Sequence, residues 1–189
     1  MKKIIFNFYH MIEFFKVISL KKFFSLNYVI NSLRYCWKDN ISKILKHYGA
    51  TIGENNHFKG SLNIDNPNLL NTAYAFKNIT IGKNCYIGKN VFFDLANEVL
   101  IDHDVIISAG VTIMTHSDVG NRGMQKYYKR VSAPVTIGKG TWVGVNVTIL
   151  AGVVIGEYCV IAAGSVVKDN IKSYSMVAGV PAKIKKDIR

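Results

Sequence analysis

Residues 135–167 read VTIGKGTWVGVNVTILAGVVIGEYCVIAAGSVV, and the apolar residues of this stretch follow a strict rhythm. One series of aliphatic residues recurs every six positions: Ile137, Val143, Ile149, Ile155, Ile161 and Val167. A helix places apolar residues three and four apart, and a hairpin protein spaces its turns irregularly. A period of six fits a short strand followed by a corner, with glycine permitting the corner. The stretch therefore predicts a coil made of repeated strand-and-corner units.

The same spacing extends toward the N-terminus, in two further series: Ile81, Ile87 and Phe93, then Ile101, Ile107 and Ile113. Three six-residue units make one triangular coil of about 18 residues, and successive coils stack ~4.8 Å apart with the aliphatic residues inside. A chance run of Val and Ile in another β-rich domain is the alternative, but it does not explain twelve positions in phase. We expect four regular coils over residues 81–170, preceded by a less regular coil or two over residues 51–80.

The spacing is interrupted twice. Two extra residues lie between Phe93 and Ile101, and 18 extra residues lie between Ile113 and Ile137. The longer insertion, near residues 115–134, is rich in Gly, Lys, Arg and Tyr. Long loops in compact folds are either functional or mobile. We expect this loop to leave the body of the coil and to form a cleft there.

His116 stands at the root of this loop, and counting coils predicts its neighbour. Phe93 and Ile113 each end a coil, so they should stack, which places Asp94 under Met114 and at the same corner as His116. A carboxylate beside an imidazole fixes the tautomer of the ring and stabilises its protonated form. Asn97 is the competing candidate for this partner. The alternative for His116 itself is a surface histidine at the end of a strand.

Composition changes near residue 50. The chain has 189 residues and a formal net charge of +12, and residues 1–50 carry nine Lys or Arg against Glu13 and Asp39. Half of the 22 aromatic residues lie in this segment, whereas 14 of the 15 glycines follow it. We predict a basic, aromatic-rich and mainly helical segment over residues 1–50 and a repeat domain over residues 51–189. The helical segment is either an amphipathic contact with an anionic membrane surface or a cap on the open end of the coil.

The positive charge has other interpretations, which the sequence does not favour. Neither a zinc finger nor another nucleic-acid-binding motif is recognisable, so we expect no nucleic-acid partner. No uninterrupted apolar stretch approaches the ~18 residues of a transmembrane helix. Cys36, Cys85 and Cys159 are odd in number and scattered, which suggests reduced thiols. We expect a cytoplasmic protein, with peripheral contact to the inner membrane as an option.

Two stretches, ITIGKNCYIGKNV (residues 79–91) and the opening one, resemble the hexapeptide-repeat acyltransferases, and the tail VKDNIKSYSMVAGVPAKIKK (residues 167–186) is similar to the usual ending of that family. The resemblance covers roughly residues 51–189. It implies an all-β fold, a left-handed parallel β-helix, and a homotrimer with active sites at the subunit boundaries. The left hand is implied by the family alone, because parallel crossovers are generally right-handed.

The resemblance also implies a reaction. Within the family, the arrangement MTHSD…APVTIG looks closest to the enzymes that acetylate sugars of surface polysaccharides. There the histidine before the long loop is the general base, which implies this role for His116, while the partner position, often asparagine, holds Asp94 here. The implied reaction is direct transfer of an acetyl group from acetyl-CoA to a sugar hydroxyl. N-acetylation of an amino sugar on a nucleotide carrier is one alternative, and a non-catalytic β-helix scaffold is another.

Further site residues come from the same resemblance. Trp142 precedes the inward Val143, so it should point outward; a tryptophan in this family's TWVG stretch often lies near the CoA arm, with packing between subunits as the alternative. Lys168 and Lys183 match basic positions of the C-terminal CoA region, although either could be ordinary solvated charge. The candidates for binding the acceptor are Asn97, Tyr127 and Tyr128.

We expect no metal. The γ-class carbonic anhydrases share the fold and use a three-histidine zinc site. Here, however, the remaining histidines do not form such a set: His10, His47 and His57 lie upstream of the regular coils, and His103 is expected to be a solvated corner residue.

Overall fold

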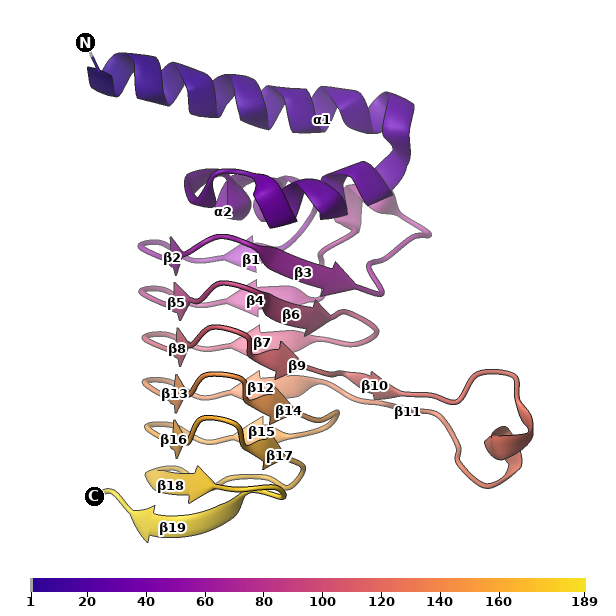
Figure 1. The fold of residues 1–189 in the computed structure, drawn as a ribbon, viewed down its shortest axis with the longest axis vertical. Coiled ribbons are helices and arrows are strands. Elements are labelled where there is room, and N and C mark those ends of the chain that lie inside the picture. The colour runs from indigo at the N-terminus through magenta and orange to yellow at the C-terminus, as the bar shows by residue number, and fades with distance from the viewer. Residues whose placement is uncertain (1) are drawn as a thin grey trace.

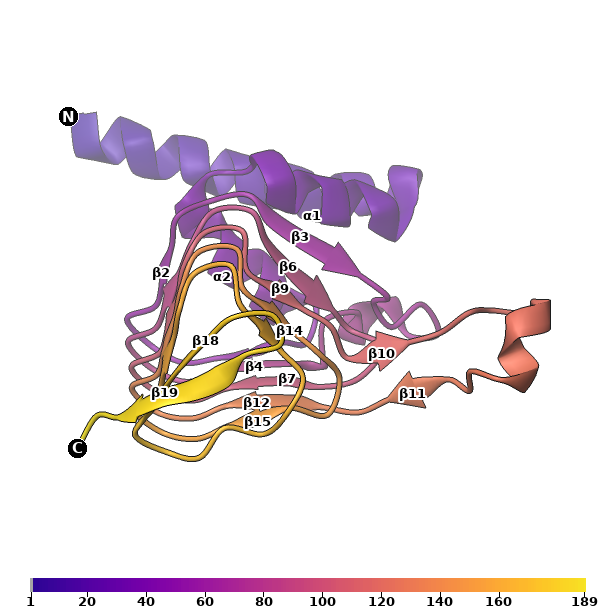
Figure 2. The same cartoon turned by 60° about the horizontal axis from the view of Figure 1, so that its bottom comes forward.

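The computed structural model describes the backbone of residues 2–189 and the side chains of residues 8–21 and 25–189. Two helices come first, α1 (Lys2–Tyr35) and α2 (Lys38–His47), and short strands follow from residue 51 onward. The strands stack in register under the helices (Figure 1), and the tilted view of Figure 2 shows that the coils are triangular in outline. The chain is a left-handed parallel β-helix, as the family resemblance implied.

Three parallel sheets form the sides of the triangle. The first sheet consists of β1 (Thr51–Ile52), β4 (Ile79–Ile81), β7 (Val99–Ile101), β12 (Val135–Ile137) and β15 (Val154–Ile155). The second consists of β2 (His57–Phe58), β5 (Tyr86–Ile87), β8 (Ile106–Ile107), β13 (Trp142–Val143), β16 (Val160–Ile161) and β18 (Ser175–Ala178), with β19 (Lys183–Asp187) antiparallel to β18. The third consists of β3 (Leu62–Asp65), β6 (Val91–Asp94), β9 (Thr112–Ile113), β14 (Thr148–Ile149) and β17 (Val166–Val167).

The register confirms the predicted inward positions. Phe93 pairs with Ile113, which in turn pairs with Ile149, and the other two sheets repeat this pattern. All twelve aliphatic or aromatic residues of the six-residue series are at most 2% exposed. Adjacent coils come so close at their corners that a Cβ atom on Gly82 would lie 2.7 Å from the backbone nitrogen of His103. Glycine is required there because the backbones of two coils touch.

The part of the prediction that concerned residues 51–80 needs a correction. Residues 51–65 form a coil as regular as the later ones, since Ile52, Phe58 and Ile64 pair with Ile81, Ile87 and Phe93. The irregular part is confined to the connection after β3, which contains the short helix η1 (Thr72–Tyr74). Phe58 and Ile64 extend the six-residue series by one coil. The connection over residues 66–78 separates this coil from the series that begins at Ile81 and hides the period in the sequence.

The helices cover one end of the coil. The α1 range contains a sharp bend at Ser25, where φ is 69°, so it comprises a first segment (residues 2–24) and a second segment (residues 26–35). Figure 1 shows the first segment crossing the end of the molecule, with α2 between it and the coils. Side chains of the second segment and of α2 are fully buried and continue the core of the coils: Val29, Leu33, Ile41, Ile44 and Leu45. Across the described residues, no helix has the length and apolarity needed to cross a membrane.

The long insertion forms an arm. Its two limbs, β10 (His116–Ser117) and β11 (Val131–Ser132), pair antiparallel, and the short helix η2 (Gly123–Lys126) lies at its tip. Figures 1 and 2 show the arm leaving the side of the coil. The predicted extruded loop near residues 115–134 is confirmed, and its strand pairing fixes the position of His116 at the root.

Candidate active site

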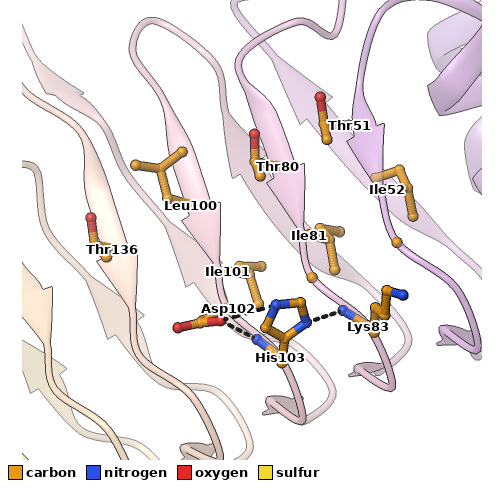
Figure 3. A pocket seen from close by; sticks show the side chains of 12 residues that line it. Thr51, Ile52, Thr80, Ile81, Lys83, Leu100, Ile101, Asp102, His103 and Thr136 are labelled. Carbon is orange, nitrogen blue, oxygen red and sulfur yellow. Dashed lines mark hydrogen bonds and ion pairs between the residues drawn. The ribbon is translucent and has the colours of Figure 1, made fainter.

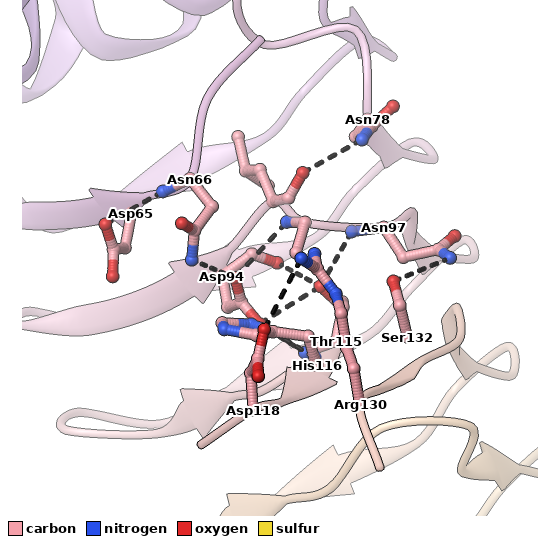
Figure 4. A network of polar contacts seen from close by, with 12 residues as sticks. Asp65, Asn66, Asn78, Asp94, Asn97, Thr115, His116, Asp118, Arg130 and Ser132 are labelled. Atoms are coloured by element: carbon pink, nitrogen blue, oxygen red, sulfur yellow. Dashed lines mark hydrogen bonds and ion pairs between the residues drawn. The ribbon is translucent and has the colours of Figure 1, made fainter. Parts of the chain in front are cut away.

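His116 and Asp94 meet at the corner between the third and first sheets. Asp94 is the last residue of β6, and the pairing of Phe93 with Ile113 brings its side chain beside the start of the arm. The imidazole Nδ1 of His116 lies 2.6 Å from the carboxylate Oδ2 of Asp94 (Figure 4). The Asp94 side chain is fully buried, whereas that of His116 is 22% exposed. The buried carboxylate thus holds an imidazole that remains open to solvent on its other side.

Asp94 is surrounded by hydrogen-bond donors. Its Oδ2 atom accepts from the backbone nitrogens of Thr115 (2.8 Å) and His116 (2.9 Å), and its Oδ1 atom accepts from Asn66 Nδ2 (2.8 Å). Burial alone would raise the pKa of Asp94, but the hydrogen bonds from His116, Asn66, Thr115 and Ala96 outweigh it and hold the pKa below its ordinary value. The group is therefore a carboxylate at neutral pH.

An ionised Asp94 can only accept hydrogen bonds, so Nδ1 of His116 carries the proton in their contact. The other ring nitrogen, Nε2, is then an acceptor, and none of the described residues is hydrogen-bonded to it. A proton taken up by Nε2 would create an imidazolium ion whose charge Asp94 stabilises. The pair has the arrangement of a general base and the residue that orients it.

A cavity of about 530 Å³ lies beside this pair. It brings together three of the predicted site residues, His116, Tyr128 and Lys168, with apolar and polar side chains from the corner and the arm: Met114, Ser117, Asp118, Val131, Leu150 and Ala151. Lys168 and Lys183 converge on Asp169, with Nζ–Oδ distances of 2.9 and 3.5 Å. The Lys168 hydrogen bond is the main cause that lowers the pKa of Asp169, and the three groups are solvent-exposed.

The other predicted residues lie apart from the imidazole. The backbone nitrogen of Asn97 donates to Thr115 Oγ1 (2.9 Å) and its side chain to Ser132 Oγ (3.3 Å), so Asn97 ties the root of the arm while Asp94 contacts the histidine. Trp142 points outward from β13, as expected, and its Nε1 atom donates to Oγ of Ser108 (3.1 Å), the residue that follows β8. Tyr127 is 74% exposed, on the arm.

Sequence reasoning missed several members of the network. Asn66 follows Asp65, the register partner of Asp94, but it belongs to the coil whose period was not recognised. Thr115 donates through Oγ1 to the Asp94 carbonyl at 2.9 Å, and nothing distinguishes it in the sequence except its place before His116. Arg130 and Asp118 form an ion pair between the two limbs of the arm, with a distance of 3.5 Å.

A second cavity, of about 470 Å³, follows the outer side of the first sheet (Figure 3). His103 lies at its edge, where its Nδ1 atom accepts from the Lys83 backbone nitrogen at 2.8 Å, and its side chain is 50% exposed. This is the corner between the first and second sheets, which His116 does not share. Among the described residues, no group of three or more His, Cys, Asp or Glu is placed to hold a metal ion.

Comparison with known proteins supplies the family. The profile described as "Bacterial transferase hexapeptide (six repeats)" matches residues 134–169, and "Hexapeptide repeat of succinyl-transferase" matches residues 78–114. The galactoside O-acetyltransferase of Escherichia coli (strain K12) is 32% identical over 145 residues, which cover 77% of this chain and 67% of that protein. The chain belongs to the hexapeptide-repeat acetyltransferases. The family and enzyme class predicted from the sequence are thereby confirmed.

Other relatives of this hexapeptide-repeat acetyltransferase agree. A putative lipopolysaccharide biosynthesis O-acetyltransferase of Escherichia coli (strain K12) is 34% identical over 119 residues, which cover 56% of this chain and 59% of that protein. A galactoside acetyltransferase solved in complex with coenzyme A has a TM-score of 0.72 at 28% identity, covering 85% of this chain and 78% of that one. A hexapeptide-repeat acetyltransferase of Vibrio cholerae, with a TM-score of 0.74 at 20% identity over 92% of this chain and 93% of that one, shares the fold.

Proposed function

We propose that the protein transfers an acetyl group from acetyl-CoA to a hydroxyl group of a sugar, with His116 as the general base. One observation carries this proposal: the 2.6 Å contact between His116 Nδ1 and the buried Asp94, beside a cavity of about 530 Å³. The contact leaves Nε2 as the basic atom at the cavity. Neither an ordinary surface histidine nor a non-catalytic scaffold needs a fully buried carboxylate that orients its imidazole.

The chemistry assigned to the pair is direct transfer. Nε2 of His116 takes the proton of the acceptor hydroxyl while the oxygen attacks the thioester carbonyl of acetyl-CoA. When the carbon–sulfur bond breaks, the imidazolium returns the proton to the leaving thiolate, so the products are the acetyl ester and CoA. Asp94 stabilises the imidazolium between these steps. The nearby Ser117 has no base arranged beside it in the described contacts, which favours direct attack over an acyl-enzyme.

The residues around the cavity fit a CoA thioester. Met114 and Leu150 provide an apolar wall of the kind that a pantetheine arm needs, and Lys168 provides a cation for an anionic group. The related galactoside acetyltransferase was solved with coenzyme A, which supports the same donor here. Lys183, which shares Asp169 with Lys168, is assigned to the same end of the donor.

The acceptor is assigned to the class of sugars in surface polysaccharides. The supporting relatives are named for a galactoside and for lipopolysaccharide biosynthesis. Tyr128 lines the cavity from the arm, where a phenol ring can stack on a sugar. Tyr127 and Asn97 complete this side in the proposal, Tyr127 as an exposed ring on the arm and Asn97 through the root of the arm.

The working unit is proposed to be a homotrimer in the cytoplasm. The outer face of the second sheet carries a ladder of exposed apolar residues in register, Tyr86, Ile106 and Trp142. Such a contiguous apolar face is typical of a surface that another subunit covers. Trp142 is separated from His116 within one chain, so it would approach the donor of an adjacent subunit. The cytoplasm holds acetyl-CoA and keeps thiols reduced, and all three cysteines are free.

The test is direct. The purified protein is incubated with acetyl-CoA and a panel of sugars, nucleotide-linked amino sugars and serine, and products are examined by mass spectrometry for one added acetyl group. An alkali-labile sugar ester formed by the wild type and by His103→Ala, but not by His116→Ala, supports the proposal. An acid- and alkali-stable amide on an amino sugar would assign N-acetylation instead. A protein that does not bind acetyl-CoA at all would be a scaffold.

The proposed oligomeric state is tested separately. Light scattering should report three chains, near three times 21.2 kDa. A stable monomer with full activity would contradict the assignment of Trp142 to an adjacent subunit.

A further inference from the structure

The first segment of α1 exposes apolar side chains at the end of the molecule. Phe8 and Phe15 are 56% and 57% exposed, and Met11 and Ile12 are each 46% exposed. Their spacing of three, four and seven residues places all four on one face of the helix. These four residues are called the outer stripe. Isolated exposed apolar residues are ordinary, whereas a contiguous patch marks a surface that binds something.

The opposite face of the same segment is already occupied. His10 and Val17 are buried, and the carbonyl of His10 accepts from Asn40 Nδ2 of α2 at 3.0 Å. Glu13 accepts from the backbone nitrogen of Trp37 at 3.2 Å, at the start of α2. The side that faces α2 is thus held by packing and hydrogen bonds. Because the outer stripe lies on the other side of the helix, it points away from α2 and from the coils.

The location of the segment makes this stripe an end surface. Figure 1 shows the first segment lying across the stack at its N-terminal end, beyond α2. A flat object laid against that end would meet the segment along its length. In the proposed homotrimer, coils that run parallel to a common axis would present three outer stripes at the same end; this step rests on the proposed function.

The charge of the segment indicates the kind of surface. Residues 1–25 contain five lysines and one acidic residue, Glu13. One of the lysines, Lys21, is turned toward the coils, where its Nζ atom donates to Thr72 Oγ1 at 2.9 Å. Glu13 is turned toward α2, while the exposed Lys16 lies beside the outer stripe, on the same side as the exposed Tyr9. Lys2, Lys3 and Lys22, whose side chains lie outside the described residues, add to the positive charge of the sequence. A lysine and an amphipathic tyrosine beside an apolar face, on a helix with a positive net charge, suit the interface of an anionic bilayer.

We propose that the outer stripe docks this acetyltransferase on an anionic lipid bilayer, with the first segment of α1 parallel to the membrane plane. The four apolar side chains enter the boundary between headgroups and acyl chains, and Lys16 meets the lipid phosphates. The inner face of the same helix continues to cap the coil. The sequence presented a membrane contact and a cap as alternatives for residues 1–50. In this proposal, opposite faces of one helix perform the two roles. In this orientation the coils extend away from the bilayer, and the arm with His116 projects from the side of the coils.

The experiment is vesicle flotation with the full chain. Wild-type protein should float with vesicles that contain phosphatidylglycerol and remain in the bottom fraction with vesicles of phosphatidylcholine alone. The variant Phe8→Ser/Phe15→Ser should bind the anionic vesicles at least ~10-fold more weakly, because two half-exposed aromatic rings per chain lose their apolar contact with the bilayer. Both side chains are exposed, and acetyl transfer to a soluble acceptor or, failing that, the thermal unfolding transition shows that the variant is folded.

A matched variant removes two exposed apolar side chains from the opposite end of the molecule, Val180→Ser/Ile184→Ser, at 71% and 54% exposure. It should float like the wild type. The proposal is overturned if wild-type protein does not float with anionic vesicles, or if Phe8→Ser/Phe15→Ser floats equally well. It is also overturned if light scattering shows that the Phe8→Ser/Phe15→Ser substitutions halve the molar mass of the wild-type assembly. The outer stripe would then be an interface between two copies of the assembly. Catalysis with a soluble acceptor is measured separately, so loss of the proposed activity and loss of membrane binding are distinguishable.

Discussion

Replacing Asp94 by alanine removes one carboxylate and leaves its donors without an acceptor. The contact with His116 Nδ1 is 2.6 Å long, and Asp94 has no exposed surface. A charge-assisted hydrogen bond of this kind contributes about 1.5–3 kcal/mol. If that energy orients the imidazole and stabilises its charged form in the transition state, its loss lowers kcat by about 10- to 150-fold. We expect a smaller effect than the loss of the base itself.

The same substitution should destabilise the fold. The backbone nitrogens of Thr115 and His116 donate to Asp94 and would lose their acceptor inside the protein, whereas the amide of Asn66, an exposed residue, can turn to water. Breaking a buried charged network by removing one member costs about 3–5 kcal/mol. This is a large part of the about 5–15 kcal/mol by which a domain is stable. A lower midpoint of thermal unfolding, with a folded protein still present at 25 °C, is the expected result.

Asp94→Asn is the matched control. Asparagine keeps the shape of the side chain and one accepting oxygen, which can face His116 Nδ1 and the backbone nitrogens of Thr115 and His116. Its amide nitrogen would then face Asn66, whose own amide can turn to present its oxygen, and the backbone nitrogen of Ala96, which loses its acceptor. The order of kcat should therefore be wild type, then Asn, then Ala. If Ala and Asn are equally impaired, the negative charge matters and the hydrogen-bond geometry does not.

The assay measures kcat and the KM for acetyl-CoA for the wild type, Asp94→Ala, His116→Ala and the double variant. The two residues act as one unit, so Asp94→Ala should change the residual rate of His116→Ala by less than about twofold. The loss of stability should persist in that background, because the buried backbone nitrogen of Thr115 is still left without an acceptor. A wild-type kcat in Asp94→Ala, or an equal fall in both backgrounds, would refute the orienting role of Asp94.

Further predictions follow from the same contacts. His116→Ala should lower kcat by ~10²- to 10⁴-fold with little change in the KM for acetyl-CoA; near-normal turnover would move the base elsewhere, with His103 first in line. Trp142→Ala should raise the KM for acetyl-CoA more than it lowers kcat, whereas a loss of the trimer in light scattering would assign the ring to subunit packing. The pKa of Asp94 lies below its ordinary value of 3.8, so its ionised form stabilises the fold above that value, and this contribution is lost as the pH falls through the lowered pKa. Thermal unfolding from pH 6 to pH 3 should therefore show the advantage of the wild type over Asp94→Asn shrinking below about pH 4, and a constant difference would contradict it.

Much of the coil was predictable because its contacts repeat at a fixed separation along the chain. In a regular coil, residue i touches residue i+18, so Val143 and Ile161 are neighbours by counting alone. The same counting placed Asp94 under the residues before His116, even though an insertion of two residues had to be recognised. The outward direction of Trp142 followed from the alternation of a strand, in which neighbours point to opposite faces.

The contacts that only the tertiary structure decided lie at the interruptions of the repeat and at the bend in α1. Asn66 reaches Asp94 from a coil whose connection, residues 66–78, breaks the period, so no spacing predicted the contact. The pairing of His116 with Ser132 closes an insertion whose internal register has no repeat to follow. The bend at Ser25 turns one predicted helical segment into two layers, and with it decides which apolar residues of α1 face α2 and which face outward. A periodic sequence specifies its own contacts because the separation is constant, whereas contacts across an insertion depend on where the chain returns, which only the packed structure determines.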